Sequence, residues 1–236
     1  MTAAALGRPR LHLRVAGSTN DRARELAAAG APHGTLVTAA VQTAGRGRQG
    51  RSWSAPAGSS LLCSLVIREP PPLVSLRAGV AVAHLVDAAA GGERTGFGPA
   101  RVKWPNDVLV GGRKVAGILV EGRPQEGWVV LGIGINVAVR VRELEGELRD
   151  RAASLGLEPG SVETVLASLL EELGRWLSAE PGVVLGALRA RDALLGRTIG
   201  WAEGRGVAAG IDDEGRLLVD LDGGRAALSA GDVHLL

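Results

Sequence analysis

The most constraining feature of this sequence is a set of apolar segments in the middle of the chain, separated by short turns. Residues 106–110 and 113–122 flank the pair Gly111–Gly112, and two glycines between such segments favour a two-residue β-hairpin turn. The segment WVVLGIGINVAV at 128–139 has the composition of a third strand. Strands joined by short turns run antiparallel. The sequence therefore predicts a β-rich centre that contains a hairpin and a third strand.

Capping residues, terminal glycines and apolar periodicity locate the other elements. They predict helices at 18–30, 75–92, 161–178 and 183–196, and strands at 35–41 and 61–67. From residue 197 the chain changes to short apolar segments with tight turns, which is typical of a small β-barrel of about 40 residues. We expect an α+β protein with a larger domain at 1–192 and a β module at 193–236.

Composition excludes several classes of protein. Of the 236 residues, 46% are hydrophobic, and no stretch approaches 18 uninterrupted apolar residues, so no membrane span and no membrane partner are expected. The start of the chain has no apolar signal region, and one cysteine excludes a disulfide framework. These features predict a cytoplasmic protein. The net charge of +2 gives no argument for nucleic-acid binding.

Lysine is rare in this chain. Of 27 basic residues, Lys103 and Lys114 are the two lysines and the other 25 are arginines. A genomic preference for arginine codons explains the scarcity, but not the position of both lysines within one short segment, KWPNDVLVGGRK. Arginine and lysine differ in geometry, hydration and chemistry. Each lysine is therefore a candidate for a task that arginine cannot perform.

The predicted hairpin brings one lysine toward a carboxylate. With Gly111–Gly112 as the turn, Leu109 pairs with Lys114, and Asp107 pairs with Ala116 on the sheet face of Lys114. We also expect Ile118 and Val120 on that face, so that Lys114 would have apolar neighbours and a carboxylate within reach. A surface lysine near a turn is the alternative interpretation. The adjacent KWPND segment favours a functional role.

A glycine- and arginine-rich loop at 44–60 is the second candidate site. Residues 45–50 match G-x-G-x-x-G, but no helix opens after the last glycine, which excludes a dinucleotide-binding fold, and no Gly-Lys-Ser/Thr follows, which excludes a P-loop. Mutually repelling arginines cannot order such a loop without an anionic ligand. Three interpretations stay open: a solvated loop, an arginine-rich nucleic-acid arm, and a lid that orders on an anion.

One predicted strand has a bare face. Gly132, Gly134 and Asn136 alternate with Ile133 and Ile135, so one side of the strand carries almost no side chains. Gly117 on the neighbouring strand extends this patch. Either a flat ring of a ligand lies there or another element packs closely.

Together these segments resemble the biotin protein ligases, the biotin–acetyl-CoA-carboxylase ligase family. The resemblance rests on STND at 18–21, QTAGRGRQGRSW at 42–53, KWPNDV at 103–108, RKVAGILVE at 113–121 and GIGIN at 132–136, in the family's order. It implies a catalytic domain like that of class II aminoacyl-tRNA synthetases, with a mixed sheet, and an SH3-like C-terminal β-barrel. Because STND begins at residue 18, the resemblance is to the ligase-only class, without a winged helix-turn-helix.

The resemblance implies a two-step reaction. Biotin and ATP with Mg²⁺ would give biotinyl-5′-AMP, and a lysine on a biotin carboxyl carrier domain of an acyl-CoA or pyruvate carboxylase would then take the biotin. Lys114 and Arg48 match catalytic positions. Biotin-binding positions are matched by Ser18, Thr19, Asn20, Gln42, Arg46, Gly47, Arg48, Lys114, Gly117 and Gly134. Positions for ATP and the adenylate are matched by Arg46, Arg48, Arg51, Trp53, Lys103, Asn106, Asp107 and Asn136. By the same resemblance, Asp107 would be an indirect partner for Mg²⁺.

Two alternative functions stay open, one in the same superfamily and one of another class. A lipoate or octanoate ligase or transferase has a related fold and a central lysine, but the GRGRQGR loop argues against it. A nucleic-acid-binding protein would use the arginine loop for phosphate contacts. For the ligase we expect no DNA partner, and a monomer or a homodimer.

Overall fold

The computed structural model describes residues 6–89 and 98–236. Its centre is a seven-stranded sheet of order β1-β2-β3-β7-β6-β5-β4, in which β1 and β2 are parallel and the other neighbours antiparallel. The strands are β1 (Arg10–Ala16), β2 (Leu36–Gln42), β3 (Ser60–Arg68), β4 (Arg101–Lys103), β5 (Asp107–Val110), β6 (Arg113–Arg123) and β7 (Trp128–Asn136). The predicted mixed-sheet α+β fold is confirmed.

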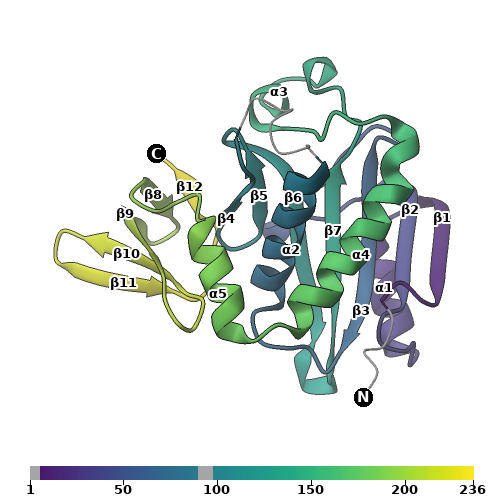
Figure 1. Ribbon diagram of the computed structural model, residues 1–236, viewed down its shortest axis with the longest axis horizontal. Coiled ribbons are helices and arrows are strands. Elements are labelled where there is room, and N and C mark those ends of the chain that lie inside the picture. The colour runs from purple at the N-terminus through teal and green to yellow at the C-terminus, as the bar shows by residue number, and fades with distance from the viewer. Residues whose placement is uncertain (1–5, 90–97) are drawn as a thin grey trace.

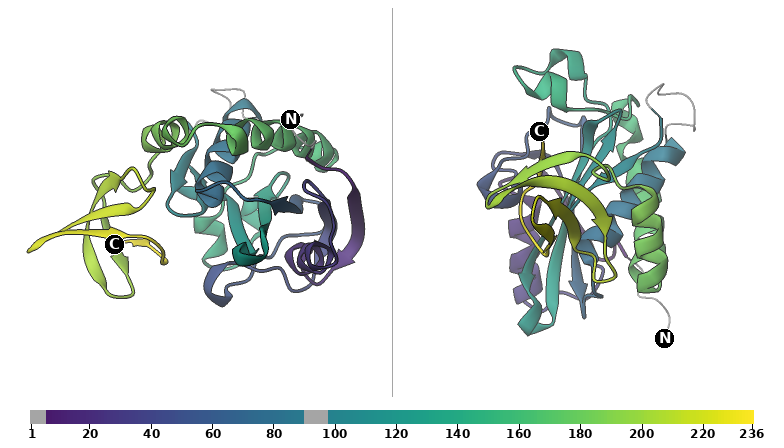
Figure 2. Two further views of the ribbon diagram at one scale, coloured as in Figure 1. Left: turned by 90° about the horizontal axis from the view of Figure 1, so that it is seen from below. Right: turned by 90° about the vertical axis from the view of Figure 1, so that its left-hand side faces the viewer.

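Helices cover both faces of this sheet (Figure 1). The helices are α1 (Thr19–Ala28), α2 (Val74–Ala89), α3 (Leu148–Arg151), α4 (Val162–Ser178) and α5 (Pro181–Ala190). The long helices α2 and α4 pack on one face over the larger core, whereas α1 packs on the other face over a smaller core that includes Val37, Val66 and Val130 (Figure 2). No helix in residues 6–89 and 98–236 has the length and apolarity needed to cross a bilayer.

The bare face of β7 points toward α1. Ile133 and Ile135 belong to the larger core on the side of α2 and α4, as the alternation predicted. Gly132 and Gly134 therefore face the opposite side, where they pair with Leu119 and Gly117 of β6. The side chains of Asn20 and Trp53 lie over Gly132 and Gly134, respectively.

The predicted register of the hairpin is wrong beyond its first two pairs. Leu109 pairs with Lys114 as expected, but a bulge at Val115 pairs Asp107 with Gly117 instead of Ala116. A bulge reverses which face the following side chains occupy. Ala116 and Ile118 consequently lie in the core, and Lys114 shares its face with Gly117, on the bare side of the sheet.

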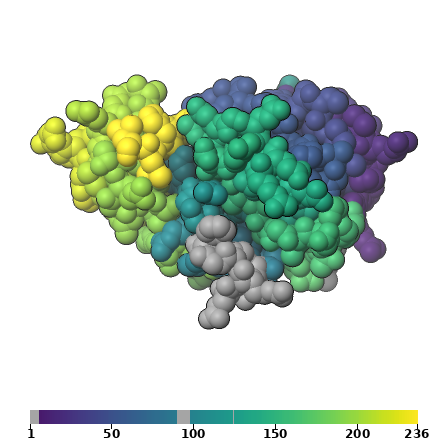
Figure 3. Space-filling model, turned by 90° about the horizontal axis from the view of Figure 1, so that it is seen from above, coloured from purple at the N-terminus to yellow at the C-terminus, as the bar shows by residue number. Residues whose placement is uncertain are grey.

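A second, antiparallel sheet of order β11-β10-β9-β8-β12 forms the C-terminal module at one end of the molecule (Figure 3). Its strands are β8 (Thr198–Trp201), β9 (Gly204–Ile211), β10 (Leu217–Leu221), β11 (Gly224–Leu228) and β12 (His234–Leu235). Trp104 Nε1 donates a 3.0 Å hydrogen bond to the carbonyl oxygen of Gly215 in this module. The module is thus fixed to the loop that precedes β5. The domain boundary at 192/193 remains a prediction.

The sequence patterns missed some elements and misplaced one helix end. Strand β1 was not predicted, although Leu11, Leu13 and Val15 alternate, and the three-residue β4 is too short to give a pattern. The helix predicted at 183–196 ends at Ala190. Beyond it the backbone turns to pair with β4, and Asp192 Oδ1 accepts a hydrogen bond from Leu194 N, a local bond that competes with helix. The predicted end of the 75–92 helix lies outside the described residues.

Arg77 holds the two long helices together. It is 2% exposed, and its guanidinium donates to the carbonyl oxygens of Pro72, Trp176, Leu177 and Ala179, the last three at the end of α4. We expect Arg77→Met to lower the free energy of unfolding by roughly 2–4 kcal/mol, because buried carbonyls would lose a charged donor. Urea unfolding measures this change. Arg140→Met, at an exposed arginine, is the control, and an equal loss in both variants would contradict the assignment.

Candidate functional site

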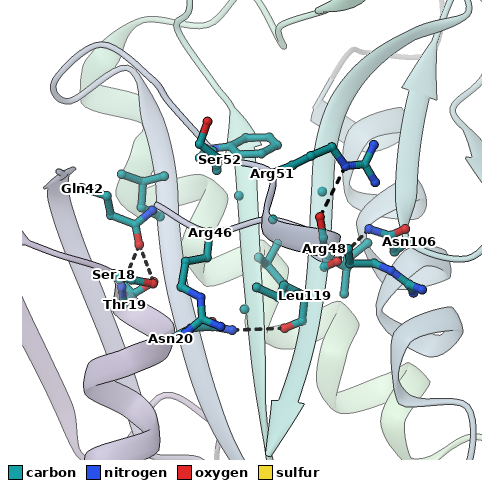
Figure 4. A pocket seen from close by; sticks show the side chains of 18 of the residues that line it. Ser18, Thr19, Asn20, Gln42, Arg46, Arg48, Arg51, Ser52, Asn106 and Leu119 are labelled. Carbon is teal, nitrogen blue, oxygen red and sulfur yellow. Dashed lines mark hydrogen bonds between the residues drawn. The ribbon is translucent and has the colours of Figure 1, made fainter. Parts of the chain in front are cut away.

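Two adjoining cavities lie on the bare side of the central sheet, and each predicted site residue lines at least one of them. The first, of about 110 Å³, is lined by Ser18, Thr19, Asn20, Gln42, Arg46, Gly47, Arg48, Arg51, Trp53, Asn106, Lys114, Gly117 and Gly134 (Figure 4). The second, of about 560 Å³, is lined by Arg51, Trp53, Lys103, Asp107, Lys114 and Asn136. The structure therefore brings together side chains that lie more than a hundred positions apart in the sequence.

Four residues line both cavities: Arg51, Ser52, Trp53 and Lys114. Two of them carry a positive charge and one is a large aromatic ring. Two molecules bound in the two cavities would therefore meet beside cationic groups. This is the arrangement needed when two anionic groups must approach each other.

Lys114 forms an ion pair with Asp107, as the hairpin predicted. Its Nζ lies 2.7 Å from Asp107 Oδ1, and no group of the described residues meets hydrogen-bond geometry at that oxygen. The same Nζ lies 5.5 Å from the centre of the Trp53 ring, within the range of a cation–π contact. The Lys114 side chain is 34% exposed and that of Asp107 is 14% exposed. The ammonium group is therefore held in place by a carboxylate and still faces the cavities.

The indole of Trp53 covers part of the bare patch. A Cβ on Gly134 would lie 2.6 Å from Trp53 Cε2, and a Cβ on Gly117 would lie 3.0 Å from Trp53 Cζ3. Both glycines are therefore needed for the ring to lie flat on the sheet. The sequence left room there for a flat ring of a ligand, and in this structure the ring that lies there is the side chain of Trp53. Trp53 Nε1 is buried and has no hydrogen-bond partner within the described residues.

The arginine loop folds back on itself before Trp53. Gly47 N donates to Arg51 O, and Trp53 N donates to Gly45 O, so the loop closes as a narrow turn around the 3₁₀ segment Arg48–Gly50. A Cβ on Gly45 would overlap the Trp53 carbonyl oxygen. Glycine is therefore required at the base of this turn.

The guanidinium of Arg46 is ion-paired in this structure. It bridges two carboxylates, Asp21 of α1 and Glu121 of β6, and so ties the loop across the first cavity. The resemblance of the motifs to the family implied that Arg46 contacts biotin and the adenylate. That contact remains a prediction, and the observed bonds give Arg46 a structural task as well.

The other two loop arginines reach the C-terminal module. Arg48 Nη2 donates to Gly231 O over 3.1 Å, and Arg51 Nη2 lies 2.8 Å from Asp232 Oδ1. Asp232 and His234 also line the second cavity. Sequence reasoning missed this contribution because no periodicity or motif connects residues that are 181 and 183 positions apart.

Several polar groups beside the cavities already have partners. Asn106 Nδ2 donates to Ile118 O, and Asn136 Nδ2 donates to Ala153 O, so both amides bind backbone as well as line a cavity. Burial lowers the pKa of Lys103, and the nearby carboxylates of Asp107 and Asp232 oppose this shift. Burial also raises the pKa of the Cys63 thiol to about 12, which keeps this residue of the first cavity uncharged.

Comparison with known proteins agrees with this geometry. Residues 13–137 match the model of the biotin/lipoate A/B protein ligase family, and residues 196–236 match the biotin protein ligase C-terminal domain. The biotin–[acetyl-CoA-carboxylase] ligase of Mycobacterium tuberculosis is 36% identical over 236 aligned residues, which cover 93% of this chain and 86% of the relative. The chain belongs to the biotin protein ligase family.

Further ligases of this family resemble the chain over most of its length. The biotin–[acetyl-CoA-carboxylase] ligase of Paracoccus denitrificans is 37% identical over 240 aligned residues, covering 92% of this chain and 96% of the relative. The structure of the Aquifex aeolicus biotin protein ligase in complex with biotin and ATP superposes with a TM-score of 0.82 at 26% identity, covering 97% of this chain and all of that one. The predicted family and fold are confirmed.

Proposed function

We propose that this protein is a biotin–[biotin carboxyl carrier protein] ligase. It activates biotin with ATP as biotinyl-5′-AMP and transfers biotin to a lysine of a carrier domain. The observation that carries this proposal is the pair of cavities joined at Lys114 and Trp53 in a member of the ligase family. The similar Aquifex aeolicus structure holds biotin and ATP.

The two cavities suit the two substrates differently. The first is small and has hydroxyl and amide groups at one end, namely Thr19, Asn20 and Gln42, which suit the ureido ring of biotin. The second is larger, contains Lys103 and Arg51, and suits a nucleotide with its phosphates. We assign biotin to the first cavity and ATP to the second.

The shared wall is where the biotin carboxylate would attack the α-phosphate of ATP. Both groups are anions, so their approach and the charge of the transition state require positive groups nearby. Lys114 is placed for this because it faces both cavities and Asp107 holds its side chain in position. Arg48 lines the biotin cavity and reaches the module beside the ATP cavity, and we assign it the same kind of stabilisation.

Mg²⁺ fits this site as a companion of the triphosphate. Magnesium in such sites is held by one or two carboxylates together with substrate phosphates. Asp107, a carboxylate of the second cavity next to Lys114, is our candidate for an indirect partner of the ion. When bound, the ion would neutralise phosphate charge.

The decisive experiment is mass spectrometry of an acceptor. A biotin carboxyl carrier domain is incubated with the protein, ATP, Mg²⁺ and biotin, and the acceptor is expected to gain the mass of one biotinyl group. A parallel reaction contains lipoate instead. Modification with lipoate and not biotin would favour the lipoate ligase, and strong salt-dependent binding of nucleic acid without modification would favour the third interpretation.

The arginine loop is expected to become more protected when the intermediate binds. An anion between Arg48 and Arg51 would stabilise charges that otherwise repel each other. Hydrogen exchange of residues 44–52 should slow in the presence of biotinyl-5′-AMP, while exchange in α4 stays constant. Equal exchange of the loop in both states would refute a lid that orders on its ligand.

A further inference from the structure

A carboxylate beside the first cavity binds two separate elements of the cavity wall. Glu121 of β6 accepts a 2.9 Å hydrogen bond from Asn20 Nδ2 at its Oε2 and a bond from the guanidinium of Arg46 at its Oε1. Asn20 lies at the start of α1, whereas Arg46 belongs to the arginine loop. Figure 4 shows the side chain of Arg46 extending from the loop toward Asn20. One side chain of the sheet therefore joins the helix and the loop that flank this cavity.

The two carboxylates that bind Arg46 differ in their exposure to solvent. The side chain of Glu121 is 20% exposed and that of Asp21 is 47% exposed. Arg24 Nη1 also lies 3.5 Å from Asp21 Oδ1, so Asp21 is shared between two guanidinium groups. Exposed ion pairs contribute little, whereas a charge-assisted hydrogen bond shielded from water contributes more. Glu121 is therefore the stronger of the two attachments of Arg46.

The position of Arg46 determines the position of the rest of the loop. Arg46 pairs with Ser52 as an antiparallel bridge, and beside this pair Trp53 N donates to Gly45 O. The indole of Trp53 lies over Gly134 and forms part of the wall of both cavities. A shift of Arg46 therefore moves the loop and the indole together.

We propose that Glu121 is a positioning residue that keeps the arginine loop closed over the first cavity and thereby limits the escape of the reaction intermediate. The inference rests on the proposed function, in which the intermediate is biotinyl-5′-AMP. Glu121 acts through Arg46, since it lines neither cavity itself. The intermediate leaves only while the loop is open, so the rate of release is proportional to the open fraction. The chemical step depends on the closed fraction, which stays close to one while the open state is minor.

The variant Glu121→Gln separates the rate of release from the rate of the chemical step. An amide has one accepting oxygen, so glutamine serves either Arg46 or Asn20, whereas the carboxylate serves both. The protein is loaded with radiolabelled biotinyl-5′-AMP, and release is followed after an excess of the unlabelled compound is added. We expect release to be about 10-fold faster or more, because loss of a charged partner acts mainly on dissociation. The single-turnover rate of biotinyl-5′-AMP formation should stay within about twofold.

Two results would overturn the proposal. One is release from Glu121→Gln within about twofold of the unaltered protein. The other is a rate of formation that falls by as large a factor as release rises, because a general defect of the site changes both rates.

Glu126 is the matched control for this variant. Its carboxylate also accepts from a guanidinium and from a second N–H donor, those of Arg123 and Trp128, but it lines neither cavity and does not contact the arginine loop. Glu126→Gln should leave the release of biotinyl-5′-AMP within about twofold of the unaltered protein. Equal acceleration in Glu126→Gln and Glu121→Gln would contradict a specific role of Glu121.

The more exposed attachment of Arg46 is expected to matter less. Asp21→Asn removes it and should accelerate release by about threefold or less, as is usual for exposed ion pairs. A larger effect in Asp21→Asn than in Glu121→Gln would assign the closure of the loop to α1 and contradict the proposal.

Hydrogen exchange of the ligand-free protein tests the route through Arg46. The Trp53 amide, bonded to Gly45 O, exchanges when the loop opens, and Glu121→Gln should speed this exchange about 10-fold. In an Arg46→Met background glutamine has only Asn20 to serve, so Glu121→Gln should change the exchange by less than about twofold. A tenfold effect retained in that background would show that Glu121 does not act through Arg46.

The exchange measurement needs no substrate, so the two proposals fail in different ways. If the unaltered protein forms no biotinyl-5′-AMP while exchange responds to Glu121→Gln as expected, the assignment of the substrate fails and Glu121 still holds the loop. If biotinyl-5′-AMP forms but neither its release nor the exchange of the Trp53 amide responds to Glu121→Gln, the assignment of Glu121 fails alone.

Discussion

Lys114→Ala is expected to lower the rate of biotinyl-5′-AMP formation by about 10²- to 10³-fold or more. The substitution removes the ammonium that faces both cavities, at the place where two anions must approach, and removing one such stabilising group typically costs this much. It also leaves the partly buried Asp107 carboxylate without its counter-ion. Pyrophosphate release with biotin and ATP, measured in a single turnover, gives the rate of this step directly.

Arg113→Ala is the matched control for that prediction. Arg113 precedes Lys114 in the same strand, is exposed, and lines neither cavity. It should keep the rate of the unaltered protein within about twofold, since surface changes are usually small. A Lys114→Ala protein that folds normally and retains full activity would remove Lys114 from the mechanism.

Gly134→Ala is expected to reduce kcat/KM by about 100-fold for both biotin and ATP. The new methyl group would lie 2.6 Å from the Trp53 ring, so the indole must move, and Trp53 forms part of the wall of both cavities. A displacement of about 1 Å in a substrate-positioning group can have an effect of this size. Steady-state kinetics with each substrate varied in turn measures it.

Gly174→Ala provides the comparison. Gly174 lies within α4 with no other atom near its missing Cβ, so alanine should leave the kinetics unchanged and stabilise the helix by up to about 1 kcal/mol. An effect on only one substrate in Gly134→Ala would show that the indole is not shared by the two cavities. Unchanged kinetics for both would show that the sheet accommodates the methyl group.

The sequence predicted most strands and helices because their apolar periodicity is strong. It also predicted the ion pair of Lys114 and Asp107, and yet placed Asp107 opposite the wrong residue. The bulge at Val115 changes the register by one residue. An extra residue in a strand cannot be recognised when all the neighbouring residues are apolar. The prediction of the contact survived because Lys114 is long enough to reach Asp107 from either register.

Most candidate site residues were found through the motifs, whereas Lys114, Asp107 and the glycines of the bare strand face also followed from local pattern. Their grouping around two cavities depends on which strands are neighbours, and β7 lies between β3 and β6 although it follows both in the chain. Ser64 belongs to no motif, and its hydrogen bond to Asn20 depends on the absence of a side chain at Gly132. Asp232 could not be predicted, since its partner Arg51 lies in a distant loop.

The contact between the arginine loop and the C-terminal module has a consequence for biosynthesis. Gly231 and Asp232, which bind Arg48 and Arg51, are synthesised after every element of the central sheet. A nascent chain whose sheet has already folded therefore still lacks two of the bonds that hold its arginine loop. We therefore expect the arginine loop to reach the arrangement described above only after these residues have left the ribosome.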